Sequence, residues 1–246
     1  MNVESAERIA LVTGGSGGIG RAIALRLAAD GFAVAVHYAG NQSRADAVVA
    51  EIRGSGGQAI AVGGDIADEQ AMQTAFDAVE AEFGSVDVVV NTAGIMQLGP
   101  IADFSLDDFD RIVRTNLRGT FVVAQQAARR VRRGGAIIAF STSVTRTQFP
   151  TYGPYVATKA AVEGLTLILA RELRGRDITV NTVAPGPTAT PLFLDGKSAE
   201  TIESLAHATP LERLGAPEDI AETVAFLAGP ARWVNGQTIF TNGGLA

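Results

Sequence analysis

The residues best suited to chemistry lie in the stretch from Ser143 to Lys159, which contains a hydroxyl, a phenol and an ammonium. Gly153 and Pro154 predict that a helix begins there, because the fixed φ of proline suits the first helical turn. Tyr155 and Lys159 then lie four residues apart, which places both side chains on one helix face. A cation beside a phenol lowers the pKa of that phenol, so the pair is suited to proton transfer.

This spacing has an ordinary explanation as well. A lone tyrosine and lysine four residues apart are more often a half-buried phenol and a solvated ammonium than a catalytic pair. Ser143, at the end of an apolar strand, is placed to hold a substrate oxygen. The pair becomes convincing only if the rest of the chain builds a cofactor site that faces this helix.

The composition fits one large α/β domain over residues 1–246. Apolar residues make up 47% of the chain, and the length is sufficient to bury a continuous sheet. The net charge of −6 disfavours binding to nucleic acid or to an anionic membrane. The basic run from Arg129 to Arg133 is an exception, and we interpret it as the positively charged end of a helix.

The chain has no cysteine and only two histidines, so we expect no disulfide and no metal site. The stretch from Met1 to Arg8 lacks the layout of a secretory signal. No apolar segment is long enough to span a bilayer. These observations predict a cytoplasmic protein with no membrane partner.

Apolar strands alternate with helical patterns along the whole chain. Such alternation predicts a doubly wound parallel sheet of about seven strands, with helices on both faces and right-handed crossovers. Residues 187–210 are rich in small residues and follow a strand, which is typical of a lid over a pocket. We expect the strands at 9–13, 32–37, 58–62, 86–90, 135–140, 178–183 and 237–240, and the helices at 21–30, 43–53, 68–83, 105–133, 154–173 and from Pro217 onward.

Glycines follow the first expected strand, at residues 14–20. A glycine turn between a buried strand and a helix lets backbone N–H groups approach a pyrophosphate. Residues 37–44, after the second strand, contain no acid, and a carboxylate there would repel a 2′-phosphate. The donors Asn41, Ser43 and Arg44 therefore favour NADP over NAD, although an ordinary polar loop is the alternative.

Asn116 lies inside the helix expected at residues 105–133. Asparagine is mildly unfavourable in a helix, so it is either exposed or has a polar task at a break in the helix.

The ordered set of motifs resembles the classical short-chain dehydrogenase/reductase family over nearly the whole chain. Within that family the chain is similar to NADP-dependent carbonyl reductases of the 3-oxoacyl-carrier-protein reductase type. The matching residues are Thr13-Gly14-x-x-x-Gly18-x-Gly20, His37-Tyr38-Ala39-Gly40, Asp65, Asn91-x-Ala93-Gly94, Asn116, Ser143, Tyr155-x-x-x-Lys159 and Pro185-Gly186.

The resemblance implies a Rossmann-type fold and the reversible reduction of a ketone or aldehyde by NADPH, for example of a 3-oxoacyl thioester or a small ketone. It assigns Tyr155 as the general acid or base, and Ser143 as the group that polarises the carbonyl. Lys159 would bind the nicotinamide ribose and lower the pKa of the phenol. Asn116 would hold a water that links Lys159 to solvent.

The resemblance also implies a homotetramer and a set of cofactor contacts. The chain departs from the family's pattern at two positions. Gly17, where many NADP-dependent members have Arg or Lys, leaves the use of NAD open as well, and Thr92, where a second asparagine is common, leaves the hydrogen bonding beneath the site open. The expected cofactor-binding residues are Gly14, Ser16, Gly18, Ile19, Gly20, Tyr38, Asn41, Ser43, Arg44, Asp65, Ile66, Asn91, Ala93, Gly94, Tyr155, Lys159, Pro185, Gly186, Thr188 and Thr190.

Two other functions remain open at this point. One is an alcohol dehydrogenase that works in the oxidative direction, because the direction depends on metabolite ratios. The other is a binding module that senses a dinucleotide without catalysis. A binding module would tolerate damage to Ser143, Tyr155 or Lys159, and all three are intact.

Overall fold

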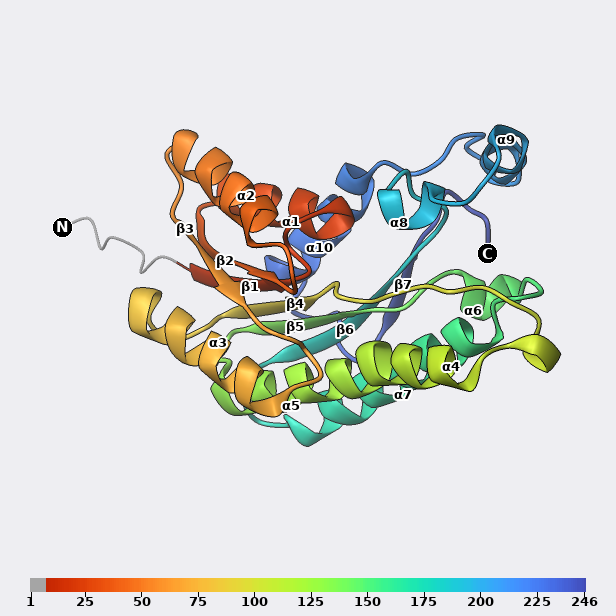
Figure 1. Ribbon diagram of the computed structural model, residues 1–246. Coiled ribbons are helices and arrows are strands. Elements are labelled where there is room, and N and C mark those ends of the chain that lie inside the picture. The colour runs from red at the N-terminus through yellow and green to blue at the C-terminus, as the bar shows by residue number, and fades with distance from the viewer. Residues whose placement is uncertain (1–7) are drawn as a thin grey trace.

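A single sheet of seven parallel strands forms the centre of the computed structural model, which describes residues 8–246 (Figure 1). The strand order is β3-β2-β1-β4-β5-β6-β7, so the doubly wound topology expected from the sequence is confirmed. The strands are β1 (Arg8–Thr13), β2 (Phe32–Tyr38), β3 (Ala59–Gly63), β4 (Val88–Asn91), β5 (Ala136–Phe140), β6 (Thr179–Pro185) and β7 (Thr238–Thr241). The expectation of a cytoplasmic protein rested partly on the stretch from Met1 to Arg8. Residues 1–7 of that stretch lie outside the described residues.

Helices cover both faces of the sheet, which explains why the strands are almost continuously apolar (Figure 1). One face packs against α1 (Gly18–Ala29), α2 (Gln42–Gly54) and α10 (Pro217–Ala228). The other packs against α3 (Glu69–Phe83), α5 (Gly119–Arg130) and α7 (Gly153–Glu172). The shorter elements are η1 (Ile101–Asp103), α4 (Leu106–Ile112), η2 (Val113–Arg118), α6 (Val144–Thr147), α8 (Pro191–Leu194) and α9 (Ala199–His207).

The order of the strands reverses at β1, which pairs with β2 on one side and β4 on the other. In open α/β sheets the crevice at the carboxyl ends of the strands beside such a reversal is where ligands bind. Thr13 at the end of β1 lies in register with Asn91 at the end of β4. The fold therefore gathers the glycine turn and the segment after Asn91 at one edge.

The helix expected at residues 105–133 is confirmed as one run of helical residues from Leu106 to Arg130, in which a π-helical turn separates α4 from α5. Ser105 caps α4 by accepting a hydrogen bond from the Asp108 backbone, at 3.4 Å. The Asp108 carboxylate, however, accepts from Gln97 and pairs with Arg111 instead of completing a capping box. Asn116 lies in the π-helical turn, so it does have a polar task at a break.

Two arginines of the basic run at the C-terminal end of α5, Arg130 and Arg132, are paired with carboxylates. Arg130 contacts Asp77 at 2.6 Å and Glu80 at 2.7 Å. The Arg132 guanidinium bonds the buried carboxylate of Asp87, which also accepts a hydrogen bond from the backbone of β1. These arginines fasten α3, α5 and the sheet together rather than forming a free basic patch.

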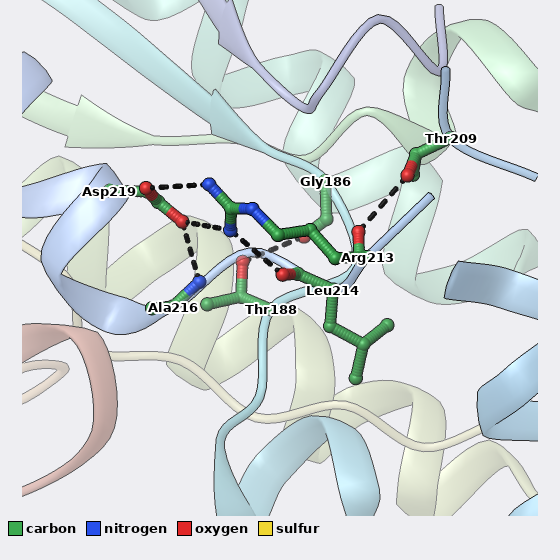
Figure 2. A network of polar contacts seen from close by, with 7 residues as sticks. All are labelled: Gly186, Thr188, Thr209, Arg213, Leu214, Ala216 and Asp219. Carbon is green, nitrogen blue, oxygen red and sulfur yellow. Dashed lines mark hydrogen bonds and ion pairs between the residues drawn. The ribbon is translucent and has the colours of Figure 1, made fainter. Parts of the chain in front are cut away.

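The segment that carries α8 and α9 is anchored at both ends (Figure 2). Thr188 forms a parallel bridge with Gly215. The Arg213 guanidinium donates to both carboxylate oxygens of Asp219 on α10, at 2.6 and 3.0 Å, and to the Leu214 carbonyl. The two ends of the segment expected as a lid are therefore joined beside the start of α10, and the middle lies above the sheet edge (Figure 1).

Within residues 8–246, the helices are all too short or too polar to cross a membrane.

Candidate active site

The side chains singled out as chemical come together after β5 and on α7. Tyr155 and Lys159 lie in the first two turns of α7, with Pro154 at its start. The buried Lys159 ammonium donates to the Phe140 carbonyl at 2.9 Å, and its Nζ lies 5.8 Å from the centre of the Tyr155 ring. Ser143 is buried three residues after the end of β5.

Ser143 is held by the neighbouring end of β6. Its backbone N–H donates to the Pro185 carbonyl at 2.9 Å, and its hydroxyl lies 3.3 Å from the Ala184 carbonyl. Because that contact is long and to a neutral acceptor, the hydroxyl proton is available to a better acceptor.

Asn116 is fully buried and faces the same region from the π-helical turn. Its amide exchanges two hydrogen bonds with the backbone of Ile95, both at 2.8 Å. A Cβ placed on Gly94 would lie 3.3 Å from the Asn116 carbonyl oxygen and 3.4 Å from the Lys159 ammonium. Asn116 thus fixes the segment after β4 against α7. Its role in holding a water stays a prediction.

A cleft of about 560 Å³ runs along the carboxyl edge of the sheet. The glycine turn borders it, and both Gly14 and Gly18 adopt positive φ, at 67° and 52°. A Cβ on Gly20 would lie 2.2 Å from the Gly14 carbonyl oxygen, so only glycine permits this tight turn into α1. The turn and the helix N-terminus fit a dinucleotide pyrophosphate.

Asp65 closes the far part of this cleft. Its carboxylate accepts from the Ala67 backbone at 2.9 Å and pairs with Arg114. Although partial burial raises the pKa of Asp65, these hydrogen bonds lower it below its ordinary value overall. This part of the cleft is therefore bordered by an ionised carboxylate that is paired with Arg114.

A smaller cavity, about 130 Å³, adjoins the cleft and contains Ser143, Tyr155 and Lys159. Ile19, Thr92, Gly94 and Thr190 are among the residues that line both hollows, so the two are continuous. A ligand lying in the cleft would reach the three catalytic candidates at its inner end.

The structure brings most of the expected cofactor residues to these two hollows. The cleft is lined by Gly14, Ser16, Gly18, Ile19, Gly20, Arg44, Asp65, Ile66, Ala93, Gly94 and Thr190. The cavity is lined by Ser143, Tyr155, Lys159, Pro185, Gly186, Thr188 and, again, Ile19, Gly94 and Thr190. The expected residues that line neither hollow are Tyr38, Asn41, Ser43, Asn91 and Asn116.

Asn41 and Asn91 lie beside the site, and their side chains hold the surrounding helices and strands in place. The Asn41 side chain caps α2 by accepting from the Arg44 backbone at 3.1 Å. Asn91 accepts from Thr13 at 2.5 Å and donates to Thr120 at 2.9 Å, which joins β1, β4 and α5. The Asn41 carbonyl oxygen and both polar atoms of the Asn91 side chain are therefore occupied within the protein.

Sequence reasoning missed the apolar wall of the cavity. This wall comes from four separate segments, and its residues are Met96, Val144, Phe149, Tyr152, Leu192, Phe193, Leu205 and Leu245. The Tyr152 ring lies edge-on to Tyr155, with centroids 6.5 Å apart. Phe149 and Tyr152 could have been found from the sequence, because they lie in the stretch before Tyr155. The fold brings the other side chains to the cavity wall.

Comparisons with known proteins agree with this geometry. The sequence model of the family described as Enoyl-(Acyl carrier protein) reductase matches residues 14–246. A short-chain type dehydrogenase/reductase of Picea abies is 45% identical over 96% of this chain and 92% of that protein. The 3-oxoacyl-[acyl-carrier-protein] reductase FabG of Staphylococcus aureus is 45% identical over 96% of this chain and 97% of that protein.

Among solved structures, a short chain dehydrogenase from Burkholderia cenocepacia, crystallised with NADP, superimposes with a TM-score of 0.91. It is 43% identical, and the match covers 98% of each chain. The chain belongs to the short-chain dehydrogenase/reductase family. It is accordingly an oxidoreductase.

In this short-chain dehydrogenase/reductase, Thr92 replaces the asparagine that many members carry. Its hydroxyl donates to the Thr13 carbonyl at 2.6 Å. Thr92 therefore completes the hydrogen-bond network beneath the site. The replacement of asparagine by threonine leaves no unpaired polar group at this position.

The pKa of Tyr155 differs from the expectation drawn from its spacing to Lys159. Burial, together with Tyr152, raises that pKa to about 12, although a hydrogen bond with Thr142 lowers it slightly. The Lys159 ammonium lies 5.8 Å from the centre of the ring and bonds the Phe140 carbonyl, and the effect of burial on the pKa outweighs its attraction for a phenolate. The phenol of this reductase-family member is therefore fully protonated at neutral pH.

Burial also lowers the pKa of Lys159, to about 8. A lysine with a lowered pKa carries its charge below that pH and loses it above. We therefore expect kcat for carbonyl reduction to be constant below about pH 7 and to fall roughly tenfold per pH unit above pH 8. A pH–rate profile from pH 6 to 10 would check this, with cofactor binding measured at each pH as control. A kcat that stays constant up to pH 10 would contradict it.

Proposed function

We propose that this protein reduces a ketone or aldehyde to an alcohol with NADPH. The observation that carries the proposal is the meeting of Ser143, Tyr155 and Lys159 in one cavity that is continuous with the cleft at the glycine turn. The cleft would hold the dinucleotide, and the cavity would hold the carbonyl group.

Each of the three side chains has a distinct task in this proposal. NADPH supplies a hydride to the carbonyl carbon when it is bound. Ser143 donates a hydrogen bond to the carbonyl oxygen and holds it toward Tyr155. The Tyr155 hydroxyl gives its proton to that oxygen as negative charge develops there. The Lys159 ammonium, buried beside the ring, stabilises the phenolate that remains, and contacts the ribose of the cofactor.

The high pKa of Tyr155 supports the reductive direction. A phenol with a pKa of about 12 is present as the acid at neutral pH and is a poor source of phenolate base. The oxidative alternative requires the phenolate at the start of the reaction. At neutral pH the site therefore stands in the protonation state from which reduction starts, whereas the net direction depends on metabolite ratios.

The preference for NADP rests on Arg44. A Cβ on Gly17 would lie 3.6 Å from the Arg44 guanidinium, so this arginine reaches over the position where related proteins carry Arg or Lys. It comes from the first turn of α2 and lines the cleft. A guanidinium there suits the 2′-phosphate of NADP. The NADP in the Burkholderia cenocepacia structure supports the same choice.

The walls of the cavity support a carbonyl compound with an apolar group beside the reacting carbon. Phe149, Tyr152, Phe193 and Leu205 surround the space beyond Ser143. Burial of such a group against these side chains contributes binding energy and excludes water. The similarity to FabG favours a 3-oxoacyl thioester among such substrates.

We propose further that residues 1–246 form one domain in which residues 187–210 act as the lid over the bound substrate. Leu192, Phe193 and Leu205 of this segment line the cavity, which supports a closing role. We also propose a homotetramer. Phe109, Phe121 and Ile168 are large apolar side chains exposed on α4, α5 and α7, which supports packing of these helices against partner subunits.

Replacing Tyr155 with phenylalanine should lower kcat by about 10²–10⁴, because the variant keeps the ring but loses the proton donor. The measurement is the initial rate of NADPH oxidation with a panel containing a 3-oxoacyl thioester, an aryl ketone, an α-diketone and a quinone. Tyr152→Phe is the matched control, since it removes a neighbouring phenol hydroxyl from the same cavity. Equal rates for Tyr155→Phe and the wild type would sink the proposed mechanism.

Arg44→Ala should raise the KM for NADPH by about 10- to 100-fold, because a hydrogen bond to a charged group contributes about 1.5–3 kcal/mol. The KM for NADH should change less than about twofold, since NADH has no 2′-phosphate. Arg171→Ala, at an exposed arginine on α7, controls for the loss of positive charge. The same increase with both cofactors would show that Arg44 does not read the 2′-phosphate.

A further inference from the structure

Glu163 lies on α7 one turn after Lys159 and two turns after Tyr155. Its side chain is partly buried. One carboxylate oxygen, Oε1, accepts hydrogen bonds from two hydroxyl groups. The Ser141 hydroxyl donates to it at 2.5 Å, and the Thr145 hydroxyl donates at 3.0 Å. Hydrogen bonds to an ionised acceptor are about twice as strong as neutral ones.

The two hydroxyls come from either side of Ser143. Ser141 precedes it by two residues, and Thr145 follows it by two. The backbone of this segment is held on its other side by β6, through Ser141 N–H to the Val183 carbonyl at 2.8 Å and Ser143 N–H to the Pro185 carbonyl at 2.9 Å. The segment is therefore fixed to β6 by its backbone. It is linked to α7 by the Glu163 carboxylate, by a 3.4 Å contact of the Ser141 hydroxyl with the Lys159 carbonyl, and by the hydrogen bond between Thr142 and Tyr155.

We propose that Glu163 is a positioning residue that sets the spacing between the Ser143 hydroxyl and the Tyr155 phenol. This inference rests on the proposed function, which requires both hydroxyls to meet one carbonyl oxygen. Ser143 and Tyr155 belong to different elements, and the segment between them contains the short α6 and two non-glycine residues with positive φ, Gln148 at 51° and Thr151 at 72°. Of the links to α7, the Glu163 contacts alone reach the segment on the C-terminal side of Ser143, at Thr145, so without them small shifts of the segment would move Ser143 relative to α7.

The Lys159 contact with the Phe140 carbonyl is not sufficient for this task. It holds α7 to the last residue of β5, ahead of the segment that carries Ser143. The Glu163 contacts lie on both sides of Ser143 and so restrain its direction as well as its distance. A shift of about 1 Å in a reacting group is enough to slow an enzyme by about 10²-fold.

The test is a double-mutant cycle between Glu163 and Ser143, read as kcat for carbonyl reduction. Glu163→Ala should lower kcat by about 10- to 100-fold and change the KM for NADPH by less than about twofold. Glu163→Gln keeps an acceptor oxygen and should recover kcat to within about threefold of the wild type. Glu172→Ala, an exposed glutamate at the end of the same helix, should leave kcat unchanged.

The deciding comparison is Glu163→Ala in the Ser143→Ala background. If Glu163 acts through Ser143, the second substitution should change kcat by less than about twofold there. An equal loss in both backgrounds would overturn the inference and leave the proposed function standing. Wild-type turnover in Ser143→Ala alone would instead contradict the role of serine in the proposed function.

Amide hydrogen exchange tests the contact between Glu163 and the segment independently of catalysis. In Glu163→Ala, residues 141–147 should exchange faster than in the wild type, whereas Glu163→Gln should keep most of the protection. Unchanged exchange in Glu163→Ala would mean that the carboxylate does not hold the segment. That result would overturn the inference whatever the kinetics of the other variants.

Discussion

The site depends on one buried cation. Lys159 has almost no exposed surface, and among residues 8–246 its ammonium has a single hydrogen bond, to the Phe140 carbonyl. A charged group taken out of water is costly, so the protein holds it only where a carbonyl dipole and a ligand can compensate. The result is a lysine with a pKa close to the working pH beside a phenol that burial keeps protonated. These two opposite shifts arise from the same burial and define an acid with a nearby stabilising charge.

The parallel sheet makes this arrangement possible. Because all strands point the same way, the ends of β1, β4, β5 and β6 meet at one edge. The glycine turn follows β1, Gly94 follows β4, Ser143 follows β5 and Pro185 ends β6. The π-helical turn adds Asn116, which ties the segment after β4 to this edge. A continuous cleft and cavity result from side chains that are far apart in the sequence.

The strands, the switch point and the three main catalytic candidates could be predicted from the sequence, because apolar runs, glycine turns and fixed spacings are local signals. The sequence offered a polar task at a break in the helix as one of two possibilities for Asn116 but could not decide between them, since a π-helical turn depends on partners such as Ile95 that the fold supplies. The cavity wall and the Glu163 contacts depend on tertiary packing in the same way. The pKa of Tyr155 was predicted in the wrong direction, because spacing indicates a nearby cation but not the extent of burial.

The most direct measurement is the pKa of Lys159 itself. The lysines of the chain are Lys159 and Lys197, so lysine labelled with ¹³C at the ε carbon gives signals that Lys197→Arg assigns. An NMR titration should show Lys159 changing near pH 8, with Tyr155 still protonated at that pH. A Lys159 midpoint near 10.5, the ordinary value for lysine, would mean that the ammonium is solvated and would contradict the account of the site.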